Sequence, residues 1–376
     1  MRSISRMVLR EIALTLKRPF RISTGVTRER RIVLVELIDA DGAVGWGECV
    51  AGEAPFYAPE TTDTAWLVIT RWVAPCVLGR AFGDPREVAP ALAHVRGHNM
   101  AKAAVEMAAW DLAATARSVP LAELLGGSRA AVETGISLGI EESLDALIDR
   151  AREATREGYR RIKLKIEVGR DVEVVERVRA ALGSDVPLMA DANGAYAASD
   201  PSHLARLQEL DGLHLMMLEQ PLASDDLLRH ARLQRKLVTP LCLDESITSP
   251  DRAADMIALG AGKVINVKPG RVGGLGPALA IHDLAREHDV PVWCGGMLES
   301  GIGRGHNVAL ASLDNFRLPG DVSPSRRYWE RDIVAPEWEM TDGRIPVPLD
   351  RPGLGVEVDR ELVDAITVRR EMLEAN

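Results

Sequence analysis

Five charged residues recur along the chain at nearly equal intervals, and each interrupts an apolar run. They are Lys165, Asp191, Glu219, Asp244 and Lys268, which lie 26, 28, 25 and 24 residues apart. One strand and one helix of a barrel together occupy about this length of chain. The spacing therefore predicts one charged side chain at the carboxyl end of each of five successive strands, on the rim where barrel enzymes place their active sites.

The three acidic residues of this set, Asp191, Glu219 and Asp244, are predicted on neighbouring strands. Carboxylates in that position would repel one another and raise one another's pKa unless a cation lay between them. Oxygen ligands with room left for water and substrate suit Mg²⁺, with Mn²⁺ as a substitute. The sequence has no cluster of cysteine and histidine that would favour zinc. We therefore expect these three carboxylates to form a magnesium site.

The two lysines of the set flank the acids in strand order, so in a closed ring they face each other across the cation. A carboxylate substrate bound to the cation has an acidified α-C–H, because the cation stabilises the enolate that forms when the proton leaves. Lys165 and Lys268 are therefore candidate catalytic residues: one removes the proton, and the other delivers one or stabilises the enolate. Lys163 lies on the same face of the strand RIKLKI. Its charge disfavours the protonated form of Lys165, and it is placed to hold the substrate carboxylate.

Each of these residues also has an interpretation without chemistry. A lysine pair in a strand is most often a solvated face, and an acid after an apolar strand, such as Asp191 or Asp244, is most often the N-cap of the next helix. Five residues in step are harder to explain by capping, because lysine cannot cap a helix N-terminus. The set as a whole favours a catalytic site.

Short apolar runs alternate with segments of helical spacing from about residue 130 onwards. Near-continuous apolar strands separated by helices are typical of parallel pairing in a sheet covered by helices. Eight such runs favour a closed α/β barrel over an open doubly wound sheet, and no GxGxxG motif opens a helix after the first strand. The runs are VETGISLGI, RIKLKI, VPLMADAN, LHLMMLEQP, PLCLDES, KVINVKPG, PVWCGGMLES and NFRLPGD.

The sequence on either side of the barrel lacks this alternation. Residues 1–128 contain two apolar strands joined at Asp41-Gly42 and a helical stretch over 101–118, which together predict an α+β module. Residues 129–340 form the predicted barrel. The turn-rich, strand-like segment 341–376 is expected to pack back on the first module.

Composition argues against several classes of protein. The formal charge of −9 disfavours a nucleic-acid-binding surface, and no run of 18 apolar residues predicts a membrane span. Charged residues interrupt the apolar residues near the N-terminus, so we expect no signal peptide. Four scattered cysteines are typical of reduced residues in a cytoplasmic protein. These are Cys49, Cys76, Cys242 and Cys294.

The KxK of RIKLKI, followed by DAN, EQP, DES and NVKPGRVGG at these intervals, resembles the enolase superfamily and its muconate-lactonizing-enzyme subgroup. The resemblance runs the full length and implies a modified TIM barrel of (β/α)7β type with an N-terminal α+β capping domain. It also implies Mg²⁺ ligands at Asp191, Glu219 and Asp244, and an acid/base pair at Lys165 and Lys268. The remaining implied site residues are Lys163, which orients the substrate, and Asn193 and Glu245 as supporting polar groups.

Within the subgroup, WCGGMLESGIGRGHNVALASLDNFRLPGDVS and RYWERD are similar to the o-succinylbenzoate synthase/N-succinylamino acid racemase family. That family implies a small-molecule carboxylate substrate, a homo-oligomer and, for the synthase, menaquinone biosynthesis. The mandelate-racemase type is disfavoured because its histidine at the seventh strand has no counterpart in PVWCGGML, and His306 is expected to be structural. Dipeptide epimerases carry DxD at the eighth strand, where this chain has only Asp321. Muconate cycloisomerase and dipeptide epimerase remain alternatives.

The same resemblance suggests substrate-binding residues. Met297 follows a small GG pair that suits a bulky acyl tail, and Ser137 on the first strand could donate to that tail, although it could equally be a buried serine bonded to backbone. Specificity loops are expected at PFRISTG and CVAGEAPFY, with Phe20 and Phe56 as lid residues or as simple packing. Arg271 is typical of racemising members, unless it only makes a surface ion pair.

Two reactions therefore remain open, and two rival classes with them. Dehydration to o-succinylbenzoate needs Lys165 as base and then acid, whereas racemisation of an N-acylamino acid needs both lysines as proton carriers. A Schiff-base aldolase would use Lys268 as a nucleophile but leaves the three acids unexplained. A binding protein without activity would need no lysine on both faces of the cation.

Overall fold

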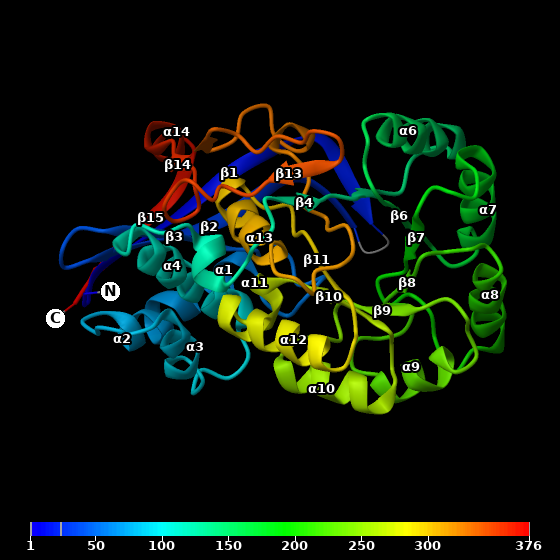
Figure 1. Cartoon of the computed structure of the whole chain (residues 1–376), viewed down its shortest axis with the longest axis horizontal. Coiled ribbons are helices and arrows are strands. Elements are labelled where there is room, and N and C mark those ends of the chain that lie inside the picture. The colour runs from blue at the N-terminus through cyan, green and yellow to red at the C-terminus, as the bar shows by residue number, and fades with distance from the viewer. Residues whose placement is uncertain (1, 23–24, 376) are drawn as a thin grey trace.

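The computed structural model describes residues 2–22 and 25–375 and consists of an antiparallel sheet with its helices beside an α/β barrel (Figure 1). The antiparallel sheet has the strand order β15-β1-β2-β3. Its strands are β1 (Ile4–Ile22), β2 (Gly25–Asp39), β3 (Val44–Cys49) and β15 (Thr367–Glu374). The expected turn at Asp41-Gly42 joins β2 to β3, and Gly42 has the positive φ of 88° that such a turn favours.

Helices cover one face of this sheet, and α4 (Asn99–Ala116), which spans most of the predicted 101–118, packs on β3. The two elements touch closely because β3 presents glycines and α4 presents alanines. A Cβ added at Gly47 would lie 2.0 Å from the carbonyl oxygen of Ala104. The other elements here are α1 (Thr62–Val68), η1 (Ile69–Val73), α2 (Ala74–Val77), η2 (Pro85–Glu87), α3 (Val88–Ala91) and α5 (Leu121–Leu125).

The barrel is a parallel sheet with the strand order β11-β10-β9-β8-β7-β6-β5, so sequential strands are neighbours. The strands are β5 (Ile136–Leu138), β6 (Ile162–Lys165), β7 (Leu188–Asp191), β8 (Leu218–Glu219), β9 (Leu241–Leu243), β10 (Val264–Val267) and β11 (Val292–Cys294). Helices lie outside the sheet, as Figure 1 shows for α6 to α10. They are α6 (Leu144–Arg156), α7 (Asp171–Leu182), α8 (Pro201–Asp211), α9 (Leu227–Gln234), α10 (Pro250–Leu259), α11 (Pro269–Val272), α12 (Leu275–Glu287) and α13 (Gly301–Ala311).

The eighth predicted run, NFRLPGD, closes the barrel without forming a regular strand. Phe316 bridges to Val292 on one edge of the sheet, and Gly320 bridges to Thr134 beside β5 on the other. The amide of Asp321 donates to the carbonyl of Cys294 at 2.8 Å. Pro319 has no backbone N–H to donate, which is one reason why a continuous ladder does not form here.

The C-terminal segment returns to both parts of the molecule. β13 (Arg344–Pro346) pairs with β4 (Ala131–Glu133), β12 (Val334–Ala335) pairs with β14 (Glu357–Val358), and β15 pairs with β1. The remaining elements are η3 (Ser325–Arg327) and α14 (Arg360–Ala365). None of the helices in the described ranges combines the length and hydropathy needed to cross a membrane.

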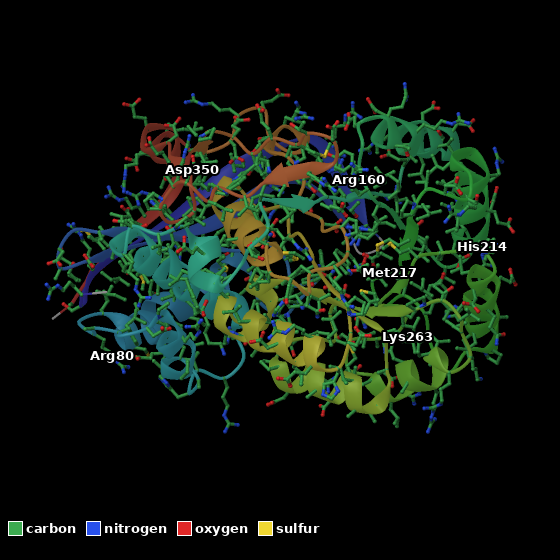
Figure 2. The ribbon with its side chains drawn as sticks, in the orientation of Figure 1. Arg80, Arg160, His214, Met217, Lys263 and Asp350 are labelled. Atoms are coloured by element: carbon green, nitrogen blue, oxygen red, sulfur yellow. The ribbon has the colours of Figure 1, made fainter. Side chains whose placement is uncertain are left out.

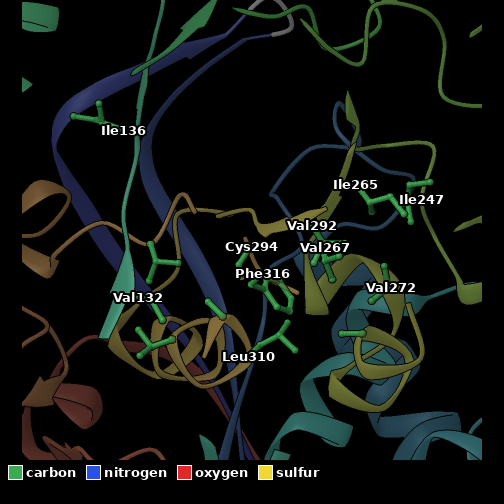
Figure 3. Packing of buried hydrophobic residues seen from close by; sticks show 14 of the residues in the cluster. Val132, Ile136, Ile247, Ile265, Val267, Val272, Val292, Cys294, Leu310 and Phe316 are labelled. Carbon is green, nitrogen blue, oxygen red and sulfur yellow. The ribbon is translucent and has the colours of Figure 1, made fainter. Parts of the chain in front are cut away.

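One buried apolar cluster extends from the barrel into the antiparallel sheet. It joins β4, β5, β10 and β11 to α13, with Val132, Ile136, Ile265 and Leu310 among the side chains in contact (Figure 3). Ile12 of β1 belongs to the same cluster. The sheet and the barrel therefore share a core, which fixes the loops of the sheet over the open end of the barrel.

Candidate active site

Alternation along the strands sends one set of side chains into the barrel. Leu164 of β6 packs outward with the helices, whereas Lys163 and Lys165 point inward, as the period of two requires. Met217, labelled in Figure 2, lies inside the ring one layer below Glu219. A polar layer at the rim therefore rests on an apolar floor formed by Met189, Met217, Cys242, Val264 and Trp293.

The five residues spaced along the sequence meet at this rim. Lys165, Asp191 and Glu219 are the last residues of β6, β7 and β8 and stand opposite one another in the sheet register. Asp244 and Lys268 directly follow β9 and β10. The three carboxylates are fully buried, with at most 1% of each residue exposed.

The two terminal lysines contact opposite ends of the row of carboxylates. The Lys165 Nζ lies 2.5 Å from Asp191 Oδ2, and the Lys268 Nζ lies 2.8 Å from Asp244 Oδ2. Glu219 stands between those two acids and receives Lys163, whose Nζ lies 3.1 Å from Glu219 Oε2. The row thus separates Lys165 from Lys268.

The charges are unevenly balanced along the row. Burial opposes ionisation of Asp191, but the ammonium groups of Lys165 and Lys163 outweigh it and hold the pKa of this carboxyl below its usual range. Lys268 does the same for Asp244, again against the effect of burial. Burial and the neighbouring charge of Asp191 instead raise the pKa of Glu219 to about 8. The cations around Glu219 are therefore too few to compensate the negative charge of its carboxylate.

This donor set fits a hard divalent cation. In the described part of the chain no three acidic, histidine or cysteine side chains converge as a metal centre, and ammonium groups contact the three carboxylates. Three buried carboxylates on adjacent strands are nevertheless the ligands that Mg²⁺ prefers, and a cation would supply the charge that Glu219 lacks. Close by, Glu245 Oε2 and Asn266 Oδ1 are buried without a hydrogen-bond partner among the described residues.

Asn193 and Glu245 connect Lys165 to the far side of the row. Asn193 Oδ1 accepts from Lys165 Nζ at 2.8 Å, and its Nδ2 donates to Glu245 Oε1 at 2.9 Å. Burial, with the charge of Asp244, raises the pKa of Glu245 to about 7. Asn193 adopts a positive φ of 45°, a conformation that asparagine tolerates better than most residues.

Arg271 lies behind Asp244 and is buried, so the interpretation as a surface ion pair is wrong. Its guanidinium donates to Asp244 Oδ1 and, through Nε, to the carbonyl of Ile247 at 2.7 Å. Tyr57, which the sequence did not single out, donates to the same Asp244 oxygen at 3.1 Å and accepts from Lys268 at 3.1 Å. Arg271 reaches the site through these two residues, because it is not among the described side chains that line the cavity.

A cavity of about 490 Å³ opens above the lysines, between the loops of the antiparallel sheet and the barrel rim. Phe20 and Met297 line it together with Lys165 and Lys268, and Phe56 stands at its edge with 68% of its surface exposed. Of the predicted loop PFRISTG, Ser23 and Thr24 lie outside the described residues. Ser137 pairs in register with Lys163 below the cavity, and its Oγ is buried with no partner among the described groups.

The glycine pair before Met297 has two separate roles. Gly296 lines the cavity, as a small wall for a bulky tail requires. Gly295 instead makes room for the catalytic layer, since a Cβ there would lie 2.2 Å from Asn266 Oδ1 and 2.6 Å from Lys268 Cε. Asn266, also missed in the sequence, donates to Glu219 Oε1 at 2.8 Å. Its inward position, two residues before Lys268 on one strand, was a usable signal.

Family models match both parts of the chain. Residues 4–126 match the family model "Mandelate racemase / muconate lactonizing enzyme, N-terminal domain", and residues 146–362 match "Enolase C-terminal domain-like". This chain belongs to the enolase superfamily. Its similarity to other superfamily members extends over nearly the whole chain. It is an enzyme of the o-succinylbenzoate synthase/N-succinylamino acid racemase family. The barrel and the capping sheet expected from the motifs are confirmed.

Several curated superfamily relatives support this placement. The o-succinylbenzoate synthase of Geobacillus kaustophilus is 49% identical over 97% of this chain and 96% of its own. The N-succinylamino acid racemase of Thermus thermophilus is 47% identical over 98% of both chains. The L-Ala-D/L-Glu epimerase of Bacillus subtilis is more distant, at 29% over 94% of this chain and 96% of its own. A superfamily member from Listeria innocua has a solved structure that superposes with a TM-score of 0.95 at 37% identity and covers 100% of both chains.

His306 of the present chain lies outside the site. It is fully buried on α13, where its Nε2 lies 2.9 Å from the carbonyl oxygen of Trp46 in β3. Burial lowers the pKa of this imidazole to about 4, so it is neutral near neutral pH. Its contact ties the barrel to the capping sheet, as expected of a structural histidine.

Proposed function

We propose that this protein removes the proton α to the carboxylate of a small molecule, as an o-succinylbenzoate synthase, an N-succinylamino acid (N-acylamino acid) racemase, or both. The observation that carries the proposal is the pair of lysine contacts at the two ends of one buried row of carboxylates. An acid/base pair on opposite sides of a substrate is what proton removal and return require.

Asp191, Glu219 and Asp244 would hold Mg²⁺, the metal typical of the family, or Mn²⁺ in its place. The bound cation would polarise the substrate carboxylate and so acidify its α-C–H. Asn193 and Glu245 would keep Lys165 and the carboxylates aligned.

Lys165 would remove the α-proton from one face of the substrate, and Lys268 would face the other side. Lys163 would remain a fixed cation that orients the substrate carboxylate. Burial opposes its charge, but Asp321, Glu219 and Asp191 outweigh that effect and hold the pKa of Lys163 well above its usual range. Phe20, Met297 and Ser137 would contact the acyl tail, and Arg271 would act from behind Asp244.

The synthase and racemase reactions make different demands on Lys268. Dehydration of a cyclohexadiene carboxylate needs proton removal and return by Lys165 alone, with Lys268 stabilising the enolate. Racemisation needs a proton carrier on each face. Removal of the α-proton, the step that both reactions share, is the function we assign to the site.

Muconate cycloisomerase and dipeptide epimerase chemistry are less well supported. The eighth-strand acid of an epimerase must be free to bind the amino group of its substrate. Here both oxygens of Asp321 are engaged by Arg161 and Lys163, at 2.7 and 2.8 Å.

The test is exchange of the α-proton in D₂O with Mg²⁺ present, using N-succinyl amino acids and the cyclohexadiene substrate of the synthase. Exchange that EDTA abolishes and Mg²⁺ restores supports the proposal. Absence of exchange with every substrate would favour a binding protein, and borohydride trapping of a carbonyl compound on Lys268 would favour an aldolase.

The setting of the enzyme is part of the proposal. Cys49, Cys76, Cys242 and Cys294 form no disulfide, which supports a cytoplasmic location. We propose a homo-oligomer that binds neither nucleic acid nor membrane, with residues 1–128 as the capping domain, 129–340 as the barrel and 341–376 as the returning segment. Menaquinone biosynthesis is the pathway if the synthase reaction is physiological.

A further inference from the structure

Lys163 is held by three carboxylates that do not have equal standing. Its Nζ lies 2.8 Å from Asp321 Oδ2, 3.1 Å from Glu219 Oε2 and 3.3 Å from Asp191 Oδ2. Glu219 and Asp191 are proposed metal ligands, so a bound cation would compete with Lys163 for their oxygens. Asp321 is outside the proposed ligand set and would remain a partner of Lys163.

Asp321 is itself fixed from below. Its Oδ1 accepts from Arg161 Nη2 at 2.7 Å, and its own amide donates to Cys294. Arg161 is fully buried, and its Nε donates to the carbonyl of Pro319 at 3.1 Å in the segment that closes the barrel. An aspartate held by a buried arginine stays in place even if Asp191 and Glu219 shift to bind a cation.

An aromatic ring completes this support. The buried ring of Trp293 lies 4.7 Å from the Arg161 guanidinium and 4.9 Å from Lys163 Nζ, measured to the ring centroid. Both cations therefore lie within cation–π range of one indole, and the indole itself donates to Cys242 Sγ at 3.2 Å. Arg161 directly precedes β6 and Lys163 lies two residues further along, so both side chains point into the barrel.

We infer that Asp321 is a positioning residue, which holds the ammonium group of Lys163 in place once Asp191 and Glu219 are bound to the cation. The inference rests on the proposed function, because it assigns those two acids to the metal. Without Asp321, Lys163 would fall back on Asp191 and Glu219 and compete with the metal for them. Asp321, in the segment that closes the barrel, thus positions Lys163 on β6 and does not bind substrate.

The test is a double-mutant cycle on metal affinity, measured by calorimetric titration of the full-length protein with MgCl₂ and no substrate. Asp321→Asn is expected to weaken Mg²⁺ binding by about tenfold, the size of coupling found between groups in contact. In the Lys163→Met background the same substitution is expected to change the affinity less than about twofold, since the competing ammonium is gone. An equal loss in both backgrounds would mean that Asp321 acts only by its charge or through the fold, and would overturn the inference.

A matched control separates a specific role from the cost of neutralising a buried acid. Asp332 is also buried, and it accepts from the amide of Gly301 and the hydroxyl of Ser325, away from the lysines. Asp332→Asn should leave the affinity for Mg²⁺ unchanged, and a loss equal to that of Asp321→Asn would count against the inference. Trp293→Phe gives a second entry into the cycle if Asp321→Asn does not fold. It should weaken binding in the same direction, and only when Lys163 is present.

Steady-state kinetics provide the second readout. Because Lys163 would orient the substrate carboxylate, Asp321→Asn should raise KM more than it lowers kcat, and it should do neither in the Lys163→Met background. If the wild-type protein binds Mg²⁺ but exchanges no α-proton, the proposed function is wrong, and the double-mutant cycle on Mg²⁺ affinity still tests Asp321. If the wild type exchanges the α-proton but the effects of the two substitutions on Mg²⁺ affinity are additive, only the inference about Asp321 is wrong.

Discussion

Lys163, Lys165 and Lys268 bring three ammonium groups into one buried layer, and each of them contacts a carboxylate from the neighbouring strand. Lys165 and Lys268 could be predicted because each ends or follows an apolar strand at regular spacing, and Lys163 because it shares a face of β6 with Lys165. Tyr57 and the bond from Asp321 to Lys163 could not be predicted, because these contacts join distant parts of the chain. Asn266 was missed although its inward position on β10 was visible in the sequence. A charge at a strand end is visible in a sequence, whereas its partner across the barrel is not.

Gly295 offers a test at this scale, because it controls the position of Lys268 without doing chemistry itself. In Gly295→Ala the new methyl group would meet Lys268 Cε and the side-chain amide of Asn266. We expect kcat to fall by about 10² while the protein stays folded, the loss typical of a misplaced acid or base. A spectrophotometric synthase assay, with thermal unfolding as a check of the fold, would measure this. Gly212→Ala is the control, since an added Cβ there would lie 3.5 Å from its nearest neighbour. Full activity in Gly295→Ala would show that Gly295 does not confine Lys268.

At the scale of elements, hydrophobic periodicity predicts most strands and helices. The prediction is wrong where tertiary packing decides the local structure against the periodicity. Ser249 caps α10, Pro250 begins it and Gly260 ends it, as the sequence indicates. The eighth apolar run looks like a strand but forms only isolated bridges. The tight contact of β3 with α4 depends on two glycines whose role appears only when the facing helix is known.

Gly47→Ala tests that contact. The added Cβ would strike the backbone of α4 at the carbonyl of Ala104, which cannot move as a flexible side chain could. We expect the free energy of unfolding to fall by about 3 kcal/mol, the upper range for overpacking in a core. Urea unfolding followed by circular dichroism would measure the loss. Gly212→Ala should cost less than about 0.5 kcal/mol, and equal stability of the two variants would contradict the packing described.

For the whole molecule, capping sheet, barrel and C-terminal segment are joined by buried polar bonds as well as by apolar contacts. Asp111 on α4 accepts from the amide of Trp46 in β3 at 2.8 Å and from that of Leu354 in the C-terminal segment at 2.9 Å. The turn-rich sequence of residues 341–376 predicts that this segment packs back on the first module. That β15 pairs with β1 could not be predicted, because pairing between the two ends of a chain leaves no local signal in the sequence.

Asp111 also gives a dependence of stability on pH. Burial raises the pKa of this carboxyl to about 7 in the folded protein, against 3.8 as its ordinary value, so the folded state binds the proton more tightly. Its contribution to stability is therefore present at low pH and is lost as the pH rises through 7. Between pH 5 and pH 8 this loss is about 3 kcal/mol. Asp111→Asn should remove it, so the substitution costs more at pH 5 than at pH 8 in urea unfolding. An equal cost at both values would mean that Asp111 titrates normally.

Opposed lysines on either side of one substrate are the central claim, and stereospecific exchange tests it most directly. Each enantiomer of an N-succinyl amino acid is incubated with Mg²⁺ in D₂O, and loss of the α-proton signal is followed by NMR for wild type, Lys165→Ala and Lys268→Ala. We predict that neither variant racemises, that Lys165→Ala still exchanges one enantiomer, and that Lys268→Ala exchanges only the other. Loss of exchange for the same enantiomer in both variants, or full racemisation by Lys268→Ala, would contradict the account.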